Sequence, residues 1–213
     1  MKKNKITIAI FAMFFLNIIG SFALFYSDFQ QFILRFSSYN LLLLLLLFYW
    51  ANNNLTMNFL KLIVLIFSIG LMVEIIGVNY KFIFGSYTYG ESLGYKIFGT
   101  PIIIGVNWTS LSLACFGISS YLFRKKYLIV LVASFLMVFT DYIIEPIASI
   151  LDFWHWSKDE IPLQNYIAWL VISLFIQVLI MTSKVTLNPK LSFALLFSQL
   201  TFFIIQYFND GLI

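Results

Sequence analysis

The chain has 213 residues, of which 62% are hydrophobic, 20% aromatic and only 10% charged, with a formal net charge of +4. A soluble domain is nearer half apolar and a quarter charged, so this composition excludes a water-soluble globular protein and predicts an integral membrane protein. The thirteen Lys and Arg are scattered or lie at segment ends, which argues against nucleic-acid binding. The single cysteine, Cys115, excludes a disulfide framework and a cysteine metal cluster.

Apolar runs of about twenty residues recur along the whole chain, and each is long enough to span a bilayer. The first is too long for the apolar part of a signal peptide and has no small-residue cleavage site after it. The sequence therefore predicts an all-α, polytopic membrane protein with about seven transmembrane helices in a single domain, 1–213. We expect the helices at 6–26, 31–50, 59–78, 98–123, 127–151, 163–183 and 191–208.

The basic residues orient these helices, because Lys and Arg are enriched in cytoplasmic loops. The distribution predicts a multi-pass protein of the cell membrane with its N-terminus in the cytoplasm and its C-terminus outside. With that orientation nine basic residues lie inside (Lys2, Lys3, Lys5, Lys61, Arg124, Lys125, Lys126, Lys184, Lys190) and four outside (Arg35, Lys81, Lys96, Lys158).

Polar residues within the predicted helices gather at one depth. The two longest loops, 79–97 and 152–162, fall on the outer side, and the first is rich in Gly and Tyr, which predicts an irregular or re-entrant segment. Four helices then bring polar groups to the same level, in the outer half of the bilayer. Their convergence predicts a functional site there, from Glu74, Asn107, Asp141, Glu145, Gln164 and Asn165.

The fifth predicted helix carries an acidic stripe. At about 100° per residue, Asp141, Glu145, Ala148 and Asp152 share one helical face. Pro146 removes a backbone hydrogen bond at that point and is expected to open space beside the carboxyl groups. An ionised carboxylate costs about 2.5–3.5 kcal/mol at mid-bilayer, and no Lys or Arg lies at the same depth. We therefore expect at least one of these carboxyl groups to be protonated at neutral pH and to act as a general acid.

Several classes of membrane protein lack the residues they need here. One histidine, His155, is too few for a zinc protease motif or a histidine-rich diiron site. The last helix has no lysine for a retinal Schiff base, and DYIIE is the only aspartate-rich spacing, which disfavours an intramembrane prenyl transferase. A proton-coupled transporter stays open as an alternative, because intramembrane carboxylates also serve proton coupling.

An ordered set of motifs resembles the CruF-type carotenoid biosynthesis family. The set is FGSYTYGESLG, then Gly99-Thr100-Pro101 with Trp108 seven residues further on, then DYIIEP, WHW and PLQNYIAW, and it spans roughly 74–169. The family pattern has Asp before the proline, where this chain has the longer Glu145. The resemblance implies a polytopic carotenoid 1,2-hydratase acting on an acyclic ψ end, as in lycopene, γ-carotene or bisanhydrobacterioruberin.

This resemblance also implies roles for the candidate residues. Hydration begins with protonation of the terminal double bond and ends with water capturing the cation, without a metal or other cofactor. Asp141 and Glu145 would share the acid and charge-stabilising roles, and Asp152 or Glu74 would position water. The substrate pocket would be formed by Tyr87, Tyr89, Asn107, Trp108, Trp154, Trp156, Asn165 and Trp169.

The expected partners are a carotenoid, water, membrane lipid and other carotenoid-pathway enzymes. Two alternatives stay open beside the transporter. A carotenoid end-group cyclase begins with the same protonation, and a carotenoid-binding scaffold needs no catalysis. For the aromatic residues, an interfacial belt is also an open interpretation.

Overall fold

The computed structural model describes residues 2–25, 27–52, 56–158 and 160–209. Seven helical segments in this part of the chain are long and apolar enough to cross a membrane, which confirms the predicted all-α, multi-pass architecture. The extreme C-terminus, 210–213, for which we predict an outer location, lies outside the described residues. The helices are α1 Lys2–Ala23, α2 Ser27–Leu34, α3 Ser37–Ala51, α4 Met57–Tyr80, α5 Ile103–Leu122, α6 Lys126–Ala148, α7 Leu163–Ser183 and α8 Pro189–Asn209.

Several helices differ from the predicted ranges. The first was expected to end at residue 26 and the fourth to begin at residue 98, but α1 ends at Ala23 and α5 begins at Ile103. The run expected as one helix over 31–50 forms α2 and α3, with a turn at residues 35 and 36, and the break coincides with Arg35, the only charged residue of that run. The fifth helix was expected to reach residue 151, but α6 ends at Ala148, two residues after Pro146. This earlier end changes the position of everything that follows it.

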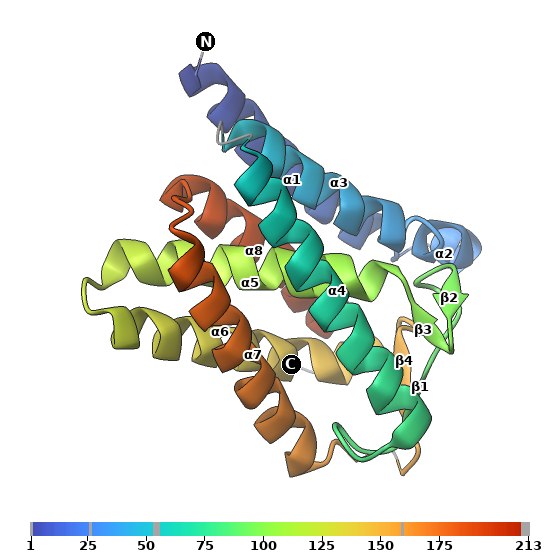
Figure 1. Cartoon of the computed structure of the whole chain (residues 1–213). Coiled ribbons are helices and arrows are strands. Elements are labelled where there is room, and N and C mark those ends of the chain that lie inside the picture. The colour runs from blue at the N-terminus through green and yellow to red at the C-terminus, as the bar shows by residue number, and fades with distance from the viewer. Residues whose placement is uncertain (1, 26, 53–55, 159, 210–213) are drawn as a thin grey trace.

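Helix α5 is the centre of the bundle. In the most apolar 18 residues of this helix 89% are buried, whereas the corresponding share in the other membrane-spanning segments is 22–50%. It packs against α3, α4, α6, α7 and α8, while α1 packs against α3 and α8 at the periphery (Figure 1). Small residues allow this close packing: at Gly117 a Cβ atom would lie 1.9 Å from the Ser192 hydroxyl of α8. A helix enclosed on all sides in this way can present polar groups to the interior of the membrane domain.

Four short strands gather at one end of the bundle (Figure 1). They are β1 Tyr87–Tyr89, β2 Lys96–Ile97, β3 Thr100–Pro101 and β4 Trp154–Trp156, and they form two antiparallel pairs, β1 with β4 and β2 with β3. The loop predicted to be irregular, 79–97, therefore contains β1 and β2, and β3 lies where the fourth helix was expected to begin. They were missed because two- and three-residue strands are too short to show a period-2 pattern.

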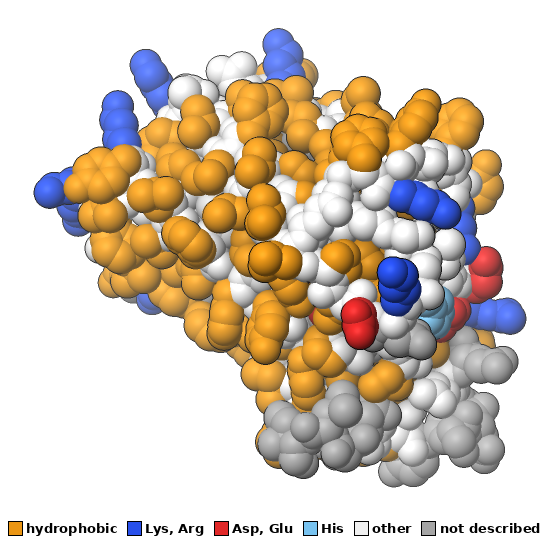
Figure 2. Space-filling view, turned by 90° about the horizontal axis from the view of Figure 1, so that it is seen from below, with side chains coloured by type: hydrophobic (Ala, Val, Ile, Leu, Met, Phe, Trp, Pro, Cys, Tyr) orange, Lys and Arg blue, Asp and Glu red, His pale blue; other side chains and the backbone are white. Residues whose placement is uncertain are grey.

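The face seen in Figure 2 has an apolar middle and charged ends. In Figure 2 hydrophobic side chains cover the middle of the visible face, with Lys and Arg at both ends. The acidic side chains and the histidine on this face lie only at one end. This distribution fits a protein whose middle faces lipid.

Candidate active site

One cavity lies where α4, α5, α6 and α7 meet the β1–β4 pair. The space between its walls is about 350 Å³ when the open space at its mouth is included. Eleven of the twelve side chains predicted to form the site line it, and their assigned roles stay predictions. The lining residues are Glu74, Phe84, Tyr87, Tyr89, Ile104, Asn107, Trp108, Asp141, Glu145, Trp154, Trp156, Asn165 and Trp169.

The β1–β4 pair delivers four of the aromatic residues. Its register places Tyr87 opposite Trp156 and Tyr89 opposite Trp154. Because side chains alternate along a strand, all four point to the same face of the pair, and that face closes the cavity. Thr88 and His155, opposite each other in the pair, are exposed on the other face. Two loops that are far apart in sequence thus form one wall.

Glu74 on α4 is fully engaged by hydrogen-bond donors. Its Oε2 atom accepts from the hydroxyl groups of Tyr87, at 2.5 Å, and Tyr89, at 2.8 Å. Its Oε1 atom accepts from the indole N–H of Trp108, at 2.9 Å. Glu74 is only 4% exposed, so these bonds replace the water that an ionised carboxylate would otherwise need. The arrangement suits a carboxyl group with a structural role.

The two tyrosines remain donors over the physiological range. Burial raises the pKa of Tyr87 and Tyr89 well above the usual value, and the neighbouring charge of Glu74 raises it further. Both hydroxyl groups are therefore protonated at neutral pH, which is the state that Glu74 requires. The tyrosine ring centroids lie 5.5 Å apart in an edge-to-face contact.

Glu145 on α6 is also held by several donors. The indole N–H groups of Trp154 and Trp156 donate to its Oε2 atom at 2.9 and 2.8 Å. The amide nitrogen of Asn165 donates to its Oε1 atom at 3.2 Å. Both oxygens are thus engaged as acceptors, which favours the ionised form of this carboxyl group.

Asp141, one turn before Glu145 on α6, has a different environment. It is 2% exposed, and its Oδ2 atom accepts from the Asn165 amide at 2.9 Å. Its Oδ1 atom has no hydrogen-bond partner among the described residues, although the side chain lines the cavity. A single asparagine amide therefore joins the two carboxyl groups of the predicted stripe and leaves one oxygen of Asp141 facing open space.

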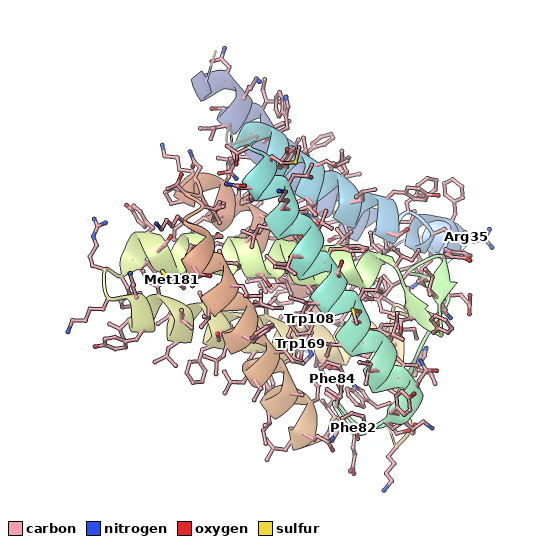
Figure 3. All side chains as sticks on the ribbon, viewed as in Figure 1. Arg35, Phe82, Phe84, Trp108, Trp169 and Met181 are labelled. Carbon is pink, nitrogen blue, oxygen red and sulfur yellow. The ribbon has the colours of Figure 1, made fainter. Side chains whose placement is uncertain are left out.

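Stacked indoles form another wall of the cavity. The Trp108 and Trp169 rings lie 3.9 Å apart at 14°, between α4 and α7 (Figure 3). Trp108 is anchored by Glu74, as described above, and α4 approaches it closely because Gly70 has no side chain there. The cavity thus combines fixed carboxylates with a large area of aromatic surface.

Of the twelve residues predicted to have a catalytic or substrate-binding role, Asp152 is the one that lies outside the cavity. The prediction that it continues the acidic stripe is wrong, because α6 ends at Ala148 and Asp152 adopts a left-handed backbone conformation, with φ 54°. Its carboxylate accepts from the backbone N–H of Glu91 at 2.8 Å and lies 2.9 Å from the His155 ring nitrogen. Although partial burial opposes them, these bonds hold the pKa of Asp152 below its usual range.

Asp152 thereby ties the two long loops, 79–97 and 152–162, together. A Cβ atom at Gly90 would lie 2.2 Å from the Asp152 carbonyl oxygen, so this contact requires glycine. His155, exposed on the outer face of the strand pair, bonds Asp152 and does not line the cavity. Of the polar residues expected at this depth, Gln164 also points elsewhere, since its amide bonds the carbonyls of Phe82 and Ile83.

Two lining residues were missed by the sequence reasoning. Ile104 lies one helical turn before Trp108, so the spacing of four residues could have revealed it. Phe84 lies between α4 and β1, where no periodicity indicates which way a side chain points. Among the described residues, no three side chains of the His, Cys, Asp and Glu types are placed to share a metal ion.

The fold and the cavity define a multi-pass membrane protein with an acidic, aromatic-lined site inside its helical bundle. Residues 36–209 match the model of a family described as carotenoid biosynthesis protein, and the chain belongs to that family. The match extends well beyond the 74–169 segment that carries the motifs. No curated protein and no solved structure matches the chain.

Proposed function

We propose that this protein adds water to the terminal C1=C2 double bond of an acyclic carotenoid ψ end, giving a tertiary alcohol without a metal or redox cofactor. The observation that carries the proposal is the asymmetry of the carboxyl pair on α6. Glu145 accepts three hydrogen bonds, whereas Asp141 accepts one and turns a free oxygen toward the cavity. Such a pair provides one proton donor and one negative charge.

Asp141 is the proton donor in this mechanism. Two carboxyl groups joined by one amide are unfavourable when both are ionised, and the donors around Glu145 favour the charge there. The proton therefore resides on Asp141, on its free Oδ1 atom. Its transfer to C2 forms a C–H bond with the electrons of the double bond and leaves a tertiary cation at C1.

Groups already fixed in the cavity stabilise that cation. Each aromatic face contributes about 0.5–2 kcal/mol to a desolvated cation, and the Trp108 indole, which is fully buried and stacked on Trp169, is the most enclosed of these rings. The Glu145 carboxylate adds an opposite charge that does not need to reorganise during the reaction. Both contributions act only while the positive charge exists, so they lower the barrier.

Water completes the reaction. Its oxygen bonds to C1, and the proton that it loses returns to Asp141, so the protein is regenerated. Asn107 is the group that we assign to hold this water, because it lines the cavity and its side chain has no hydrogen-bond partner among the described residues. Glu74, which the sequence also suggested for this role, is already occupied by three donors.

Product analysis in a lycopene-accumulating host tests the proposal. Wild-type protein is expected to give a product heavier by one water, and Asp141→Asn and Glu145→Gln are expected to give none. Glu160→Gln, at an exposed position, is the matched carboxyl control. A product of unchanged mass would indicate a cyclase. Unchanged pigments with every protein would indicate a transporter or a binding scaffold.

The location of the site in the outer half of the bilayer belongs to the same proposal. A carotenoid is about as long as the roughly 30 Å hydrocarbon core, so its end groups reach the interface, where water is available. Cysteines introduced at the exposed Thr88 and Lys158 are expected to react with membrane-impermeant reagents added outside intact cells. Reaction only from the cytoplasmic side would invert the topology. Lipid and other carotenoid-pathway enzymes are the remaining proposed partners.

A further inference from the structure

A second cavity adjoins the first. It lies among α1, α3, α5, α6 and α8, and the space between its walls is about 590 Å³ when the open space at its mouth is included. Ile104, Asn107 and Trp154 line both cavities, so these three side chains form the partition between them. Trp154 is part of both sites, because its N–H bonds Glu145 while its ring borders the second cavity.

Most of the second cavity is apolar and none of it is charged. Its walls include Leu41, Ile144, Phe153, Phe202 and Phe203. No Lys, Arg, His, Asp or Glu is among the described residues that line it. A phosphate-bearing lipid headgroup or a diphosphate would find no counter-charge here, so the fitting occupant is an uncharged apolar molecule.

Two of the side chains that line this cavity, Gln199 and Asn40, carry a donor and an acceptor without partners among the described residues. Gln199 is 4% exposed, and its amide nitrogen has no hydrogen-bond partner among the described residues. The Asn40 Oδ1 atom is also buried without a partner in the described part of the chain. The Asn40 amide is oriented by Asn17, whose Oδ1 atom accepts from the Asn40 Nδ2 atom at 3.3 Å. This bond directs the free oxygen of Asn40 away from Asn17.

A hydroxyl group meets both requirements, because it accepts one hydrogen bond and donates another. A pure hydrocarbon would leave the Gln199 donor and the Asn40 acceptor unpaired, which is unfavourable in an apolar interior. We propose that the second cavity binds the hydroxyl-bearing end of an uncharged isoprenoid alcohol, with Gln199 donating to the hydroxyl oxygen and Asn40 accepting its proton.

This site deepens the proposed function in one respect. If the carboxyl pair hydrates a ψ end, its tertiary alcohol product belongs to the class that the second cavity recognises, and this link rests on the proposed function. The binding of an isoprenoid alcohol in the second cavity does not depend on the proposed function. An alcohol that crosses the partition at Asn107 would leave the carboxyl groups free for the next double bond.

Equilibrium binding to purified protein in nanodiscs tests the site. The probe is geranyllinalool, an acyclic tertiary isoprenoid alcohol, measured against the hydrocarbon obtained by dehydrating it. All measurements use an Asp141→Asn background, so that turnover cannot change the ligand. The wild-type cavity is expected to bind the alcohol about 10-fold more tightly than the hydrocarbon, as expected for one or two buried hydrogen bonds.

Gln199→Leu and Asn40→Leu are each expected to reduce this preference to about 2-fold or less without weakening hydrocarbon binding. Thr201→Val is the control on α8, since its hydroxyl bonds the Phe197 carbonyl of its own helix. Equal affinity for alcohol and hydrocarbon in the wild-type cavity would overturn the proposal, even if a variant did not fold. So would a preference that persists in both leucine variants.

The outcomes separate this inference from the proposed reaction. An alcohol preference that depends on Gln199 and Asn40 supports the site even where product analysis finds no hydration. Hydration in cells without such a preference supports the reaction and overturns the site.

Discussion

The α4 and α6 walls of the cavity carry the same chemical group in contrasting surroundings. Glu74 on α4 accepts three hydrogen bonds from rigid aromatic donors. Asp141 on α6 accepts one, from an amide that it shares with Glu145. Both groups are almost completely buried. If Asp141 is the proton donor, as we propose, burial alone does not identify a reactive carboxyl group, and the number of hydrogen bonds that each carboxyl group accepts is the better guide.

The largest expected effect is the loss of activity in Asp141→Asn. Asparagine keeps an oxygen that accepts from Asn165 but carries no transferable proton, so the hydration rate is expected to fall about 10²–10⁴-fold. The thermal unfolding temperature should stay close to that of the wild type. Initial rates in liposomes and a melting curve measure the two effects. A variant with nearly full activity would show that Asp141 is not the acid.

Glu74→Gln is expected to have the opposite effect, with a larger loss of stability than of activity. The glutamine amide keeps one acceptor oxygen, but its NH2 group would face either the Trp108 N–H or the two tyrosine hydroxyl groups. At least one hydrogen bond is then lost, which destabilises the fold by about 1.5–3 kcal/mol, the value of one hydrogen bond to a charged group. Chemical denaturation of the purified protein measures this. If Glu74→Gln is as stable as wild type and inactive, Glu74 belongs to the chemistry and the comparison fails.

Gly70→Ala tests how closely α4 must approach Trp108. A Cβ atom at this position would lie 2.5 Å from the Cβ atom of Trp108. Because the indole is fixed by Glu74 and stacked on Trp169, we expect a loss of about 1–3 kcal/mol in stability. Gly20→Ala is the matched control, since a methyl group there would have no neighbouring atom within 4 Å. Equal melting temperatures for the two variants would contradict this close packing of α4 on Trp108.

The smallest expected effect concerns the loop contact at Asp152. Its pKa is lower in the folded protein, so the contact stabilises the loops above pH about 4 and weakens as the pH falls further. Asp152 is partly exposed, which limits the contribution to less than about 1 kcal/mol. The Glu91 amide should lose protection against hydrogen exchange as the pH falls, when its exchange rate is compared with the intrinsic rate at each pH. Asp152→Asn should remove this dependence, and an unchanged pH profile in that variant would refute it.

Much of the fold could be predicted from the sequence because the hydrocarbon core of a bilayer allows few backbone conformations. A run such as 163–183 must form a helix of that length, since no water satisfies its backbone in the bilayer. Helical spacing also placed Asp141 and Glu145 on one face before any tertiary contact was known. The same rule failed for Asp152, because it assumes that the helix continues, and the end at Ala148 was not marked by a change in hydropathy.

The sequence by itself determined that the chain lies in a membrane, where its helices are, and which polar side chains the helices carry, because these depend on composition and local periodicity. Only the tertiary structure decided which donors each carboxyl group meets. Those donors come from β1, β4, α5 and α7, and pairing between Tyr87–Tyr89 and Trp154–Trp156 depends on contacts between residues almost seventy positions apart. The unpaired Gln199 amide in the second cavity was hidden for the same reason, since a hydrogen bond that is not made leaves no pattern along the chain.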